Sequence, residues 1–276
     1  MAESVFSLKN VGYSYPGNIV AIKDLMLDIN KGERAAIIGA NGTGKSTLLT
    51  LLDALIFPNA GSITAFGGEI TERAMRDAQT QRDFRKRVGF VFQNPDVQLF
   101  CPTVREDIVF GPLQLGVDHD EIRERLDAIA EKIRISHLLD RSPHQLSIGE
   151  KKKAAIASVL IMEPEVLLLD EPTAGLDPQT MRDIIDVLDQ AHKAGKTVVF
   201  ATHDLHIVEE IADIVHVFGN YRSIVRSGTA EDVLSDNAFL QVNNLVHVHV
   251  HRHLGVKHVH PHDHSHTHDH PHTPPQ

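Results

Sequence analysis

The sequence predicts an α/β protein with a mixed sheet, and three observations lead to this prediction. An apolar run at 35–38 precedes a glycine-rich loop and a second apolar run at 48–52, which is the order strand, loop and helix. The run 166–169 is apolar without alternation, as in a parallel strand that is covered on both faces. Segments 4–10 and 21–29 have the pattern of strands joined by a turn, which indicates an antiparallel part near the N-terminus.

The glycine-rich loop has the spacing of a phosphate-binding loop, Gly-x-x-x-x-Gly-Lys-Ser, between a strand and a helix. Its glycines let the backbone approach a ligand closely, and the N–H groups at the start of the helix attract an anion. Lys45 is expected to reach the β- and γ-phosphates of a nucleotide, and Ser46 to ligate Mg²⁺. A plain helix cap is the alternative, but every fixed position of the motif is present. The predicted binding residues of the loop are Gly39, Asn41, Gly42, Gly44, Lys45, Ser46 and Thr47.

The composition narrows the class of protein and of partner. The chain has 276 residues, of which 42% are apolar, which suits one large domain or two small ones. Its formal net charge of −10 argues against nucleic acid as a partner. The single cysteine excludes an internal disulfide and fits a reducing cytosol. The N-terminus does not resemble a signal peptide, and no apolar run approaches the roughly 18 residues of a membrane span, so any membrane role is expected to be peripheral.

Apolar patterns and turn signals predict the remaining elements. Residues 103–140 have helical spacing and indicate an all-helical insertion between strands. Another helix begins at Ser147, which forms a capping box with Glu150. The polar segment 232–237 indicates the end of the folded domain. Further strands are predicted at 62–65, 88–92, 197–202, 214–218 and 223–226, and a further helix at 178–194.

Polar side chains follow three of these strands at their carboxyl ends. Asp170 and Glu171 come after the run 166–169, and His203 follows the strand at 197–202. Ligands bind at the carboxyl ends of strands in α/β folds, so Asp170, Glu171 and His203 are candidate site residues. Gln93 could touch a metal-bound water or a phosphate, although a loop hydrogen bond is the commoner role. Tyr15 could stack on an adenine ring, although packing within a hairpin is commoner.

Four motifs occur in one order along the chain: the phosphate loop, Leu-Ser-Ile-Gly-Glu at 146–150, the strand end at 167–171 and Thr-His-Asp at 202–204. Together they resemble the nucleotide-binding subunit of an ABC (ATP-binding cassette) transporter, from residue 4 to about residue 235. The resemblance implies an ABC-type P-loop NTPase fold, with a mixed sheet core, an N-terminal antiparallel β part and an inserted helical subdomain. It also implies ATP and Mg²⁺ as cofactors and a second ATPase subunit as partner.

The resemblance implies a role for each matching residue that binds ATP. Tyr15 would stack on the adenine. Gln93 would sense Mg²⁺ and contact the membrane partner. Ser147 and Gly149 would contact the γ-phosphate of the ATP that the other subunit holds. The chain departs from the usual Leu-Ser-Gly-Gly-Gln motif at Ile148 and at Glu150.

The resemblance also implies the residues of hydrolysis. Asp170 would bind Mg²⁺, Glu171 would be the general base that polarises the attacking water, and His203 would contact the γ-phosphate. Lys45 would neutralise phosphate charge, and Asp177 would lie at the dimer interface. Within the family, the segments 92–100 and 103–107 resemble the energy-coupling-factor (ECF) type, which imports vitamins, cobalt and nickel.

The C-terminal segment is rich in histidine, because 12 of the chain's 19 histidines lie from His247 to His272. If 247–253 is a strand, its alternate residues His247, His249, His251 and His253 share one face. Residues 258–272 are low-complexity and are expected to be disordered. Imidazoles bind Ni²⁺, Co²⁺ and Zn²⁺, so we predict a transition-metal site here. A purification tag or a tail without function are the alternatives.

The resulting hypothesis is an ATPase subunit that energises a membrane importer of a transition metal, nickel or cobalt. It would lie on the cytoplasmic face of the cell membrane as a homodimer, bound to integral membrane subunits through the Gln93 region. We expect an ATP-binding domain at 1–236 with a helical subdomain at about 94–162, and a tail at 237–276. Three alternatives stay open: an ECF-type ATPase for vitamin uptake with an incidental tail, a soluble ABC ATPase acting on DNA or ribosomes, and a metal store.

Overall fold

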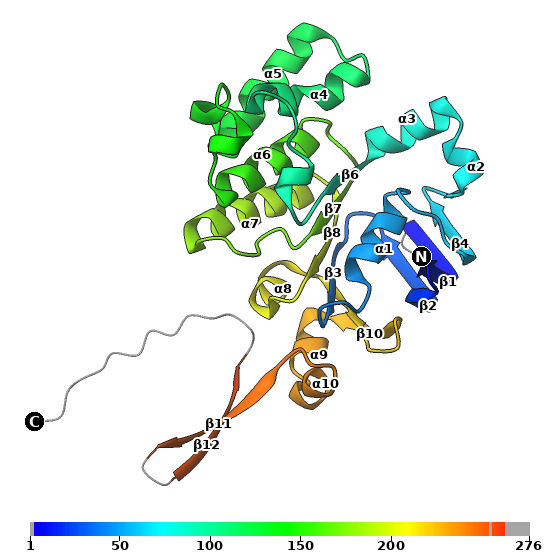
Figure 1. The fold of residues 1–276 in the computed structure, drawn as a ribbon, viewed down its shortest axis with the longest axis vertical. Coiled ribbons are helices and arrows are strands. Elements are labelled where there is room, and N and C mark those ends of the chain that lie inside the picture. Colours follow the sequence, from blue (N-terminus) through cyan, green and yellow to red (C-terminus); the bar gives the residue numbers. More distant parts are fainter. Residues whose placement is uncertain (1–2, 254–255, 263–276) are drawn as a thin grey trace, which may run out of the picture.

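The computed structural model describes residues 3–253 and 256–262, with side chains described as far as residue 246 (Figure 1). The described strands form a six-stranded sheet, a four-stranded sheet and a two-stranded ribbon. The six-stranded core sheet has the order β10-β9-β3-β8-β7-β6, and only β10 is antiparallel to its neighbour. Its strands are β3 (Arg34–Gly39), β6 (Val88–Val91), β7 (Val166–Asp170), β8 (Thr197–Thr202), β9 (Ile214–Phe218) and β10 (Ile224–Thr229).

The predicted antiparallel part is a second sheet, with the order β2-β1-β4-β5. Both strands of its hairpin are longer than predicted, because pairing continues to Tyr15 and Ile19 across register shifts. The sheet consists of β1 (Ser4–Tyr15), β2 (Ile19–Asn30), β4 (Ala60–Ala65) and β5 (Gly68–Glu69). Together the two sheets confirm the predicted fold class, which is α/β with a mixed core sheet and an antiparallel N-terminal part.

Helix α1 (Lys45–Leu52) follows the phosphate loop and lies between the two sheets (Figure 1). Its leucines are fully buried in a cluster with β1, β2 and alternate residues of the core sheet. The other face of β3, β7 and β8 belongs to a second cluster, formed with the helical part of the chain. Burial on both faces explains why these strands are apolar without alternation.

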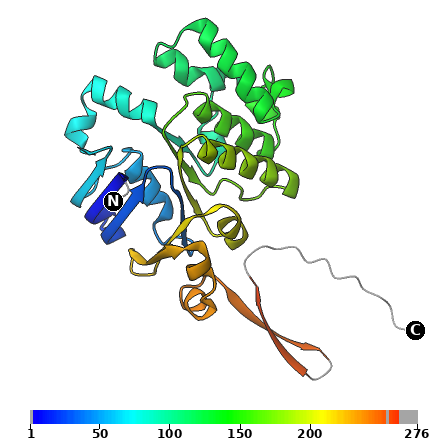
Figure 2. The same ribbon diagram turned by 180° about the vertical axis from the view of Figure 1, so that it is seen from behind.

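The predicted helical insertion consists of α4 (Val104–Gln114) and α5 (His119–Lys132), followed by α6 (Ile148–Leu160). The chain breaks between α4 and α5 at Gly116, whose φ of +73° ends the first helix. Helices α7 (Pro178–Lys193) and α8 (Leu205–Ile211) follow β7 and β8. In both views, α4 to α7 gather on the side of the core sheet away from α1 (Figures 1 and 2).

The polar stretch after β5 also forms helices, α2 (Glu72–Met75) and α3 (Ala78–Arg87). Two of its basic residues form ion pairs with acidic residues of other elements. Arg85 pairs with the buried carboxylate of Asp53 at 2.8 Å, and Arg87 pairs with Glu165 at 2.6 Å. The partners lie far away in the sequence, so spacing along the chain does not indicate them.

Buried residues continue past the predicted domain end at 236. Helices α9 (Ala230–Leu234) and α10 (Asn237–Val242) pack on the core, where Leu240, Leu245 and Val246 are buried. The ribbon of β11 (His247–His253) and β12 (Val256–His262) then leads away from the body (Figures 1 and 2). Disorder was expected from residue 258, but the backbone pairs His251 with His258 and His247 with His262.

The predicted metal-binding side chains of His247, His249, His251 and His253 lie outside the described side chains. Their backbone belongs to β11, as the alternation of histidine and valine indicates. Within the described residues, no helix combines the length and the apolar character needed to cross a membrane.

Candidate active site

A pocket of about 500 Å³ lies where β3 passes into α1, and it contains most of the predicted site residues. Gly39, Asp170 and His203 are outside its lining, but each adjoins a residue that lines it. Two further predicted residues, Ser147 and Gly149, lie on a different surface and do not line this pocket. The predicted residues that line it are Tyr15, Asn41, Gly42, Gly44, Lys45, Ser46, Thr47, Gln93 and Glu171.

The phosphate loop is held tightly between the two sheets. Gly44 has a φ of +121°, and a Cβ at this position would lie 2.5 Å from the carbonyl oxygen of Ala21 in β2. A Cβ at Gly39 would lie 2.7 Å from the carbonyl oxygen of Phe218 in β9. Only glycine fits at these two positions, so the loop takes its shape from both neighbouring strands.

Lys45 is buried at the base of the pocket. Its ammonium donates to the carbonyl oxygens of Gly39, at 2.7 Å, and of Ala40, at 3.3 Å. Burial lowers the pKa of Lys45, while the carboxylates of Glu171 and Asp170 act in the opposite direction. An ammonium held only by neutral carbonyls can exchange them for phosphate oxygens, which accept stronger, charge-assisted hydrogen bonds.

Ser46 and Asp170 form a pair of oxygen ligands beside the loop. The Ser46 side chain hydrogen-bonds the Asp170 carboxylate, and burial raises the pKa of that carboxyl group. Within the described part of the chain, the buried Oδ1 of Asp170 has no hydrogen-bond partner. A buried carboxylate oxygen without a partner next to a hydroxyl fits Mg²⁺, which prefers oxygen ligands and keeps positions for phosphate and water.

Glu171 lies beyond Asp170, at the end of β7, and both of its carboxylate oxygens have partners. Oε1 lies 2.9 Å from Nδ1 of His203, and Oε2 accepts the hydroxyl hydrogen bond of Thr202 at 3.3 Å. Both partners come from the end of β8, the next strand of the sheet. The parallel pairing of β7 with β8 therefore brings the predicted acid and the predicted histidine together.

Tyr15 lies at the rim of the pocket. Its hydroxyl is 3.1 Å from the hydroxyl of Thr47 in α1, and its ring meets the ring of Tyr13 edge to face at 5.0 Å. The residue is 40% exposed, so part of its surface is available for contact with a ligand. Ile19 and Val20 of β2 line the pocket next to it and add apolar surface.

Ser147 and its neighbours form a separate surface at the start of α6. The capping box is complete, because Glu150 Oε2 accepts hydrogen bonds from both the N–H and the hydroxyl of Ser147, each at 2.8 Å. These bonds lower the pKa of Glu150. Gly149 faces α7, where an added Cβ would lie 3.0 Å from Thr180. Asp177 caps α7 by accepting from Gln179 and Thr180 N–H groups, each at 3.0 Å.

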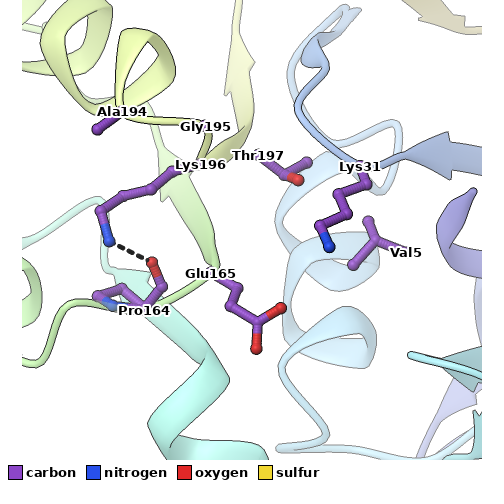
Figure 3. Close-up of a pocket in the computed structure, with 8 residues that line it drawn as sticks. All are labelled: Val5, Lys31, Pro164, Glu165, Ala194, Gly195, Lys196 and Thr197. Carbon is purple, nitrogen blue, oxygen red and sulfur yellow. Dashed lines mark hydrogen bonds between the residues drawn. The ribbon is translucent and has the colours of Figure 1, made fainter.

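A second, smaller pocket of about 160 Å³ lies at the opposite edge of the core sheet, where β7 and β8 begin (Figure 3). Lys196 borders it and donates to the carbonyl oxygen of Pro164 at 2.7 Å. None of the predicted site residues lines it. The chemistry therefore belongs to the carboxyl edge of the sheet, as in other α/β folds.

The sequence prediction missed two residues near the site. Arg222, in the β9–β10 turn, lines the pocket and donates to the carbonyl oxygen of Gly42. It is 180 residues away from its partner and belongs to no motif. Lys152 in α6 is buried and donates to the carbonyl oxygen of Glu171 at 2.9 Å. Its spacing from the apolar residues Ala155 and Ile156 would have placed it on the buried face of the helix.

Comparison with known proteins identifies the family of this arrangement. Residues 22–174 match the ABC transporter family. A putative ABC transporter ATP-binding protein of Methanosarcina acetivorans is 48% identical over 247 residues, covering 88% of this chain and 90% of that protein. The nickel import ATP-binding protein NikO of Rhodobacter capsulatus is 48% identical over 239 residues, covering 86% of this chain and 93% of that protein.

Solved structures agree with this assignment. The chain resembles cbiO1 from Clostridium perfringens, part of the ABC transporter complex cbiONQ, with 36% identity and a TM-score of 0.75, covering 88% of this chain and 95% of that one. It also resembles the dimeric ATP-binding cassette MJ0796 bound to ADP and Pi in a post-hydrolysis state, with 27% identity and a TM-score of 0.73, covering 82% and 98% of the two chains. The chain therefore belongs to the ABC transporter family, as one of the ATP-binding cassettes that couple ATP hydrolysis to transport.

Proposed function

We propose that this chain hydrolyses ATP to energise a membrane importer whose cargo is a transition-metal cation, nickel or cobalt. One observation carries the catalytic part of the proposal: the phosphate loop, Ser46, Glu171 and Gln93 line one pocket, and Asp170 and His203 contact two of these residues. The cargo rests on two weaker supports. A relative named for nickel import is 48% identical, and the C-terminal segment is rich in histidine.

The chain's own residues divide the work of hydrolysis. Lys45 and the N–H groups at the start of α1 hold the phosphates, because both present positive charge to them. Glu171 accepts the proton of the attacking water, and its bonds to His203 and Thr202 fix the direction of its carboxylate. His203, which contacts the base, would donate toward the γ-phosphate.

Ser46 and Asp170 would hold the metal ion, with Gln93 at the same end of the pocket. When bound, Mg²⁺ supplies charge neutralisation for the phosphate oxygens. Tyr15 would offer its ring to the adenine, with Ile19 and Val20 beside it.

Two copies of the chain would complete each active site. Ser147 and Gly149 lie outside the pocket of their own chain, yet a capped helix start with free N–H groups suits an anion. In a homodimer, the start of α6 would meet the γ-phosphate held by the other subunit, with Asp177 close to the interface. The dimeric state of a structural relative bound to ADP and Pi supports this arrangement.

The surface next to Gln93 suits a membrane subunit. Four apolar side chains, Val97, Phe100, Phe110 and Leu113, are between 41% and 66% exposed there, and the rings of Phe100 and Phe110 pack edge to face at 5.0 Å. We call these four residues the docking patch. Exposed apolar groups that lie together mark interaction sites, and Gln93 comes just before these four residues in the sequence. An apolar helix of the membrane subunit is the proposed occupant, with the chain held at the cytoplasmic face of the membrane.

The experiment for the whole proposal is uptake of radiolabelled Ni²⁺ and Co²⁺ by cells that express this chain with its membrane partners. Cells expressing Glu171→Gln are the control. Uptake of one metal that disappears in the control supports ATP-driven import and identifies the cargo. Intact ATPase activity without uptake of either metal contradicts the cargo and directs attention to vitamins, the alternative within the ECF type.

The histidine-rich tail needs a test of its own. We propose that it binds the same divalent metal, because closely spaced imidazoles chelate Ni²⁺, Co²⁺ and Zn²⁺. Equilibrium dialysis of Ni²⁺ against the full chain and against a chain shortened after Val246 measures the difference. The full chain should bind more metal, and the excess should decline below about pH 6.5 as histidines become protonated. Equal binding by the two chains contradicts the proposal.

A further inference from the structure

Lys152 is a charged side chain with almost no access to solvent. It lies in α6, five residues after Ser147, and is 1% exposed. Its ammonium donates to the backbone carbonyl oxygen of Glu171 at 2.9 Å. An ammonium buried in a protein is unfavourable unless it is paired and hydrogen-bonded. An uncharged side chain of similar length would pack equally well. The charge of Lys152 therefore calls for an explanation beyond packing.

The carbonyl that Lys152 contacts belongs to a residue in an unusual backbone conformation. Glu171 has a φ of +46°, in the left-handed region that residues with side chains rarely adopt. Its N–H donates to the carbonyl oxygen of Ala201 in β8 at 2.9 Å. Lys152 thus holds the carbonyl side of Glu171, and β8 holds the N–H side. Conformations of this kind persist only where the surroundings determine them, and they are common at active sites.

The charges around Lys152 point to the same place. Burial lowers the pKa of Lys152 to about 8, while the carboxylates of Asp170 and Glu171 oppose that change. Burial raises the pKa of Asp170, and the charge of Lys152 is one of those that oppose this rise. The neighbouring lysines of α6 make different contacts, because Lys151 pairs with Asp96 and Lys153 pairs with Asp183. Among these three lysines, only Lys152 reaches the end of β7.

We propose that Lys152 is a positioning residue that couples the seating of α6 to the orientation of Glu171. The inference rests on the proposed role of Glu171 as the base. Ser147 caps the same helix that carries Lys152. Contact of Ser147 with the other subunit's ATP would therefore fix the position of α6. The Lys152 ammonium then holds the Glu171 peptide group in the conformation that aims the carboxylate. ATP held by the other subunit and contacted by Ser147 would in this way help to orient Glu171, the base of this chain's own site.

The test compares steady-state ATP hydrolysis by the full chain and by variants of two adjacent lysines. Lys152→Met keeps the length of the side chain and removes the donor and the charge. We expect kcat to fall roughly tenfold to a hundredfold, as when a group that orients a functional residue is lost, with KM for ATP little changed. Lys152→Arg keeps a donor, so its kcat should lie between those of the unaltered chain and Lys152→Met. Lys153→Met, which loses the ion pair with Asp183, should lower the Tm and leave kcat unchanged.

A double-variant comparison separates positioning from a general structural role. If Lys152 acts through Glu171, adding Lys152→Met to Glu171→Gln should not lower the residual rate further. If Lys152→Met lowered the rate as much in the Glu171→Gln background as in the unaltered chain, the inference would be overturned. A normal kcat for Lys152→Met alone would also overturn it. Should Lys152→Met fail to fold, Lys152→Gln carries the same expectation, since its shorter, uncharged side chain does not reach the carbonyl. A normal kcat for Glu171→Gln alone would instead remove the proposed base.

Discussion

Oε1 of Glu171 lies 2.9 Å from Nδ1 of His203, and its other carboxylate oxygen is bound by Thr202. A carboxylate held at both oxygens cannot rotate freely, so its direction is set before a substrate arrives. All three residues lie at the carboxyl ends of β7 and β8, which are neighbours in the core sheet. The register between two strands thus determines the geometry of the proposed base.

Glu171→Gln should nearly abolish turnover while ATP still binds. The amide keeps the size of the side chain but cannot take a proton, and a general base contributes roughly a hundredfold to ten-thousandfold to a rate. Steady-state hydrolysis and the affinity for a fluorescent ATP analogue measure the two effects. Glu209→Gln, on the surface of α8, is the matched control and should behave as the unaltered chain. Normal turnover of Glu171→Gln would rule out the assignment.

Asp53→Asn should flatten the dependence of stability on pH. Burial raises the pKa of Asp53 to about 7, from an ordinary value of about 3.9, although the nearby guanidinium of Arg85 opposes this rise. Between these values the folded chain holds a proton that the unfolded chain has released, so the free energy of unfolding falls as the pH rises. A difference of one bound proton changes the free energy of unfolding by at most about 1.4 kcal/mol per pH unit. Urea denaturation from about pH 4 to pH 8 measures the slope.

The control for this experiment is Asp28→Asn, which changes an exposed aspartate of β2. Its pH profile should match that of the unaltered chain. A slope that survives in Asp53→Asn would show that the Asp53 carboxyl group stays ionised in the fold, with Arg85 compensating its charge.

Glu150→Gln should weaken the fold slightly and strengthen the ATP-dependent dimer. Glu150 accepts two hydrogen bonds from Ser147 at the start of α6, where a negative charge stabilises a helix by about 0.3–1 kcal/mol. The same charge would repel the γ-phosphate that Ser147 is proposed to contact. Thermal melts should show a lower Tm, and size-exclusion chromatography in a Glu171→Gln background should show more dimer with ATP. A weaker dimer would mean that the carboxylate assists the contact.

Phe100→Ser should weaken binding to the membrane subunits without affecting hydrolysis by the isolated chain. Phe100 is 66% exposed in the docking patch, so its loss removes apolar contact area and little core packing. Co-purification from detergent-solubilised membranes measures the binding. Tyr221→Ser changes a ring that is 84% exposed on a different loop, and it should leave the complex intact. Equal loss in both variants would place the membrane contact elsewhere.

The sequence predicted the parts of the site that depend on local spacing. The phosphate loop has fixed positions within nine residues, and the end of β7 shows as an apolar run followed by Asp170 and Glu171. The first strand is predicted to end at residue 10, but its pairing with β2 continues across irregular register to Tyr15. Leu240 and Leu245, which follow the predicted domain end at 236, are buried by tertiary contacts that no repeated pattern in the sequence indicates.

Contacts between distant residues could not be predicted. Arg85 pairs with Asp53 across 32 positions, and Arg222 contacts Gly42 across 180. Lys152 stands in a run of three lysines, which suggests a solvated face until the helix is packed. The run of charges does not reveal which of the three lysines is buried, and only the helical spacing of Lys152 from the apolar Ala155 and Ile156 indicates its face.

Helix α1 has a further consequence for how the chain responds to nucleotide. Its leucines join β1 and β2 to alternate residues of β3, β7 and β8 in one buried cluster. The two sheets should therefore melt as one cooperative unit. ATP, held at the first turn of α1, would stabilise both sheets at once. Amide hydrogen exchange should slow along the whole of β1 and β2 as well as in the core strands, and not only at the residues that line the pocket.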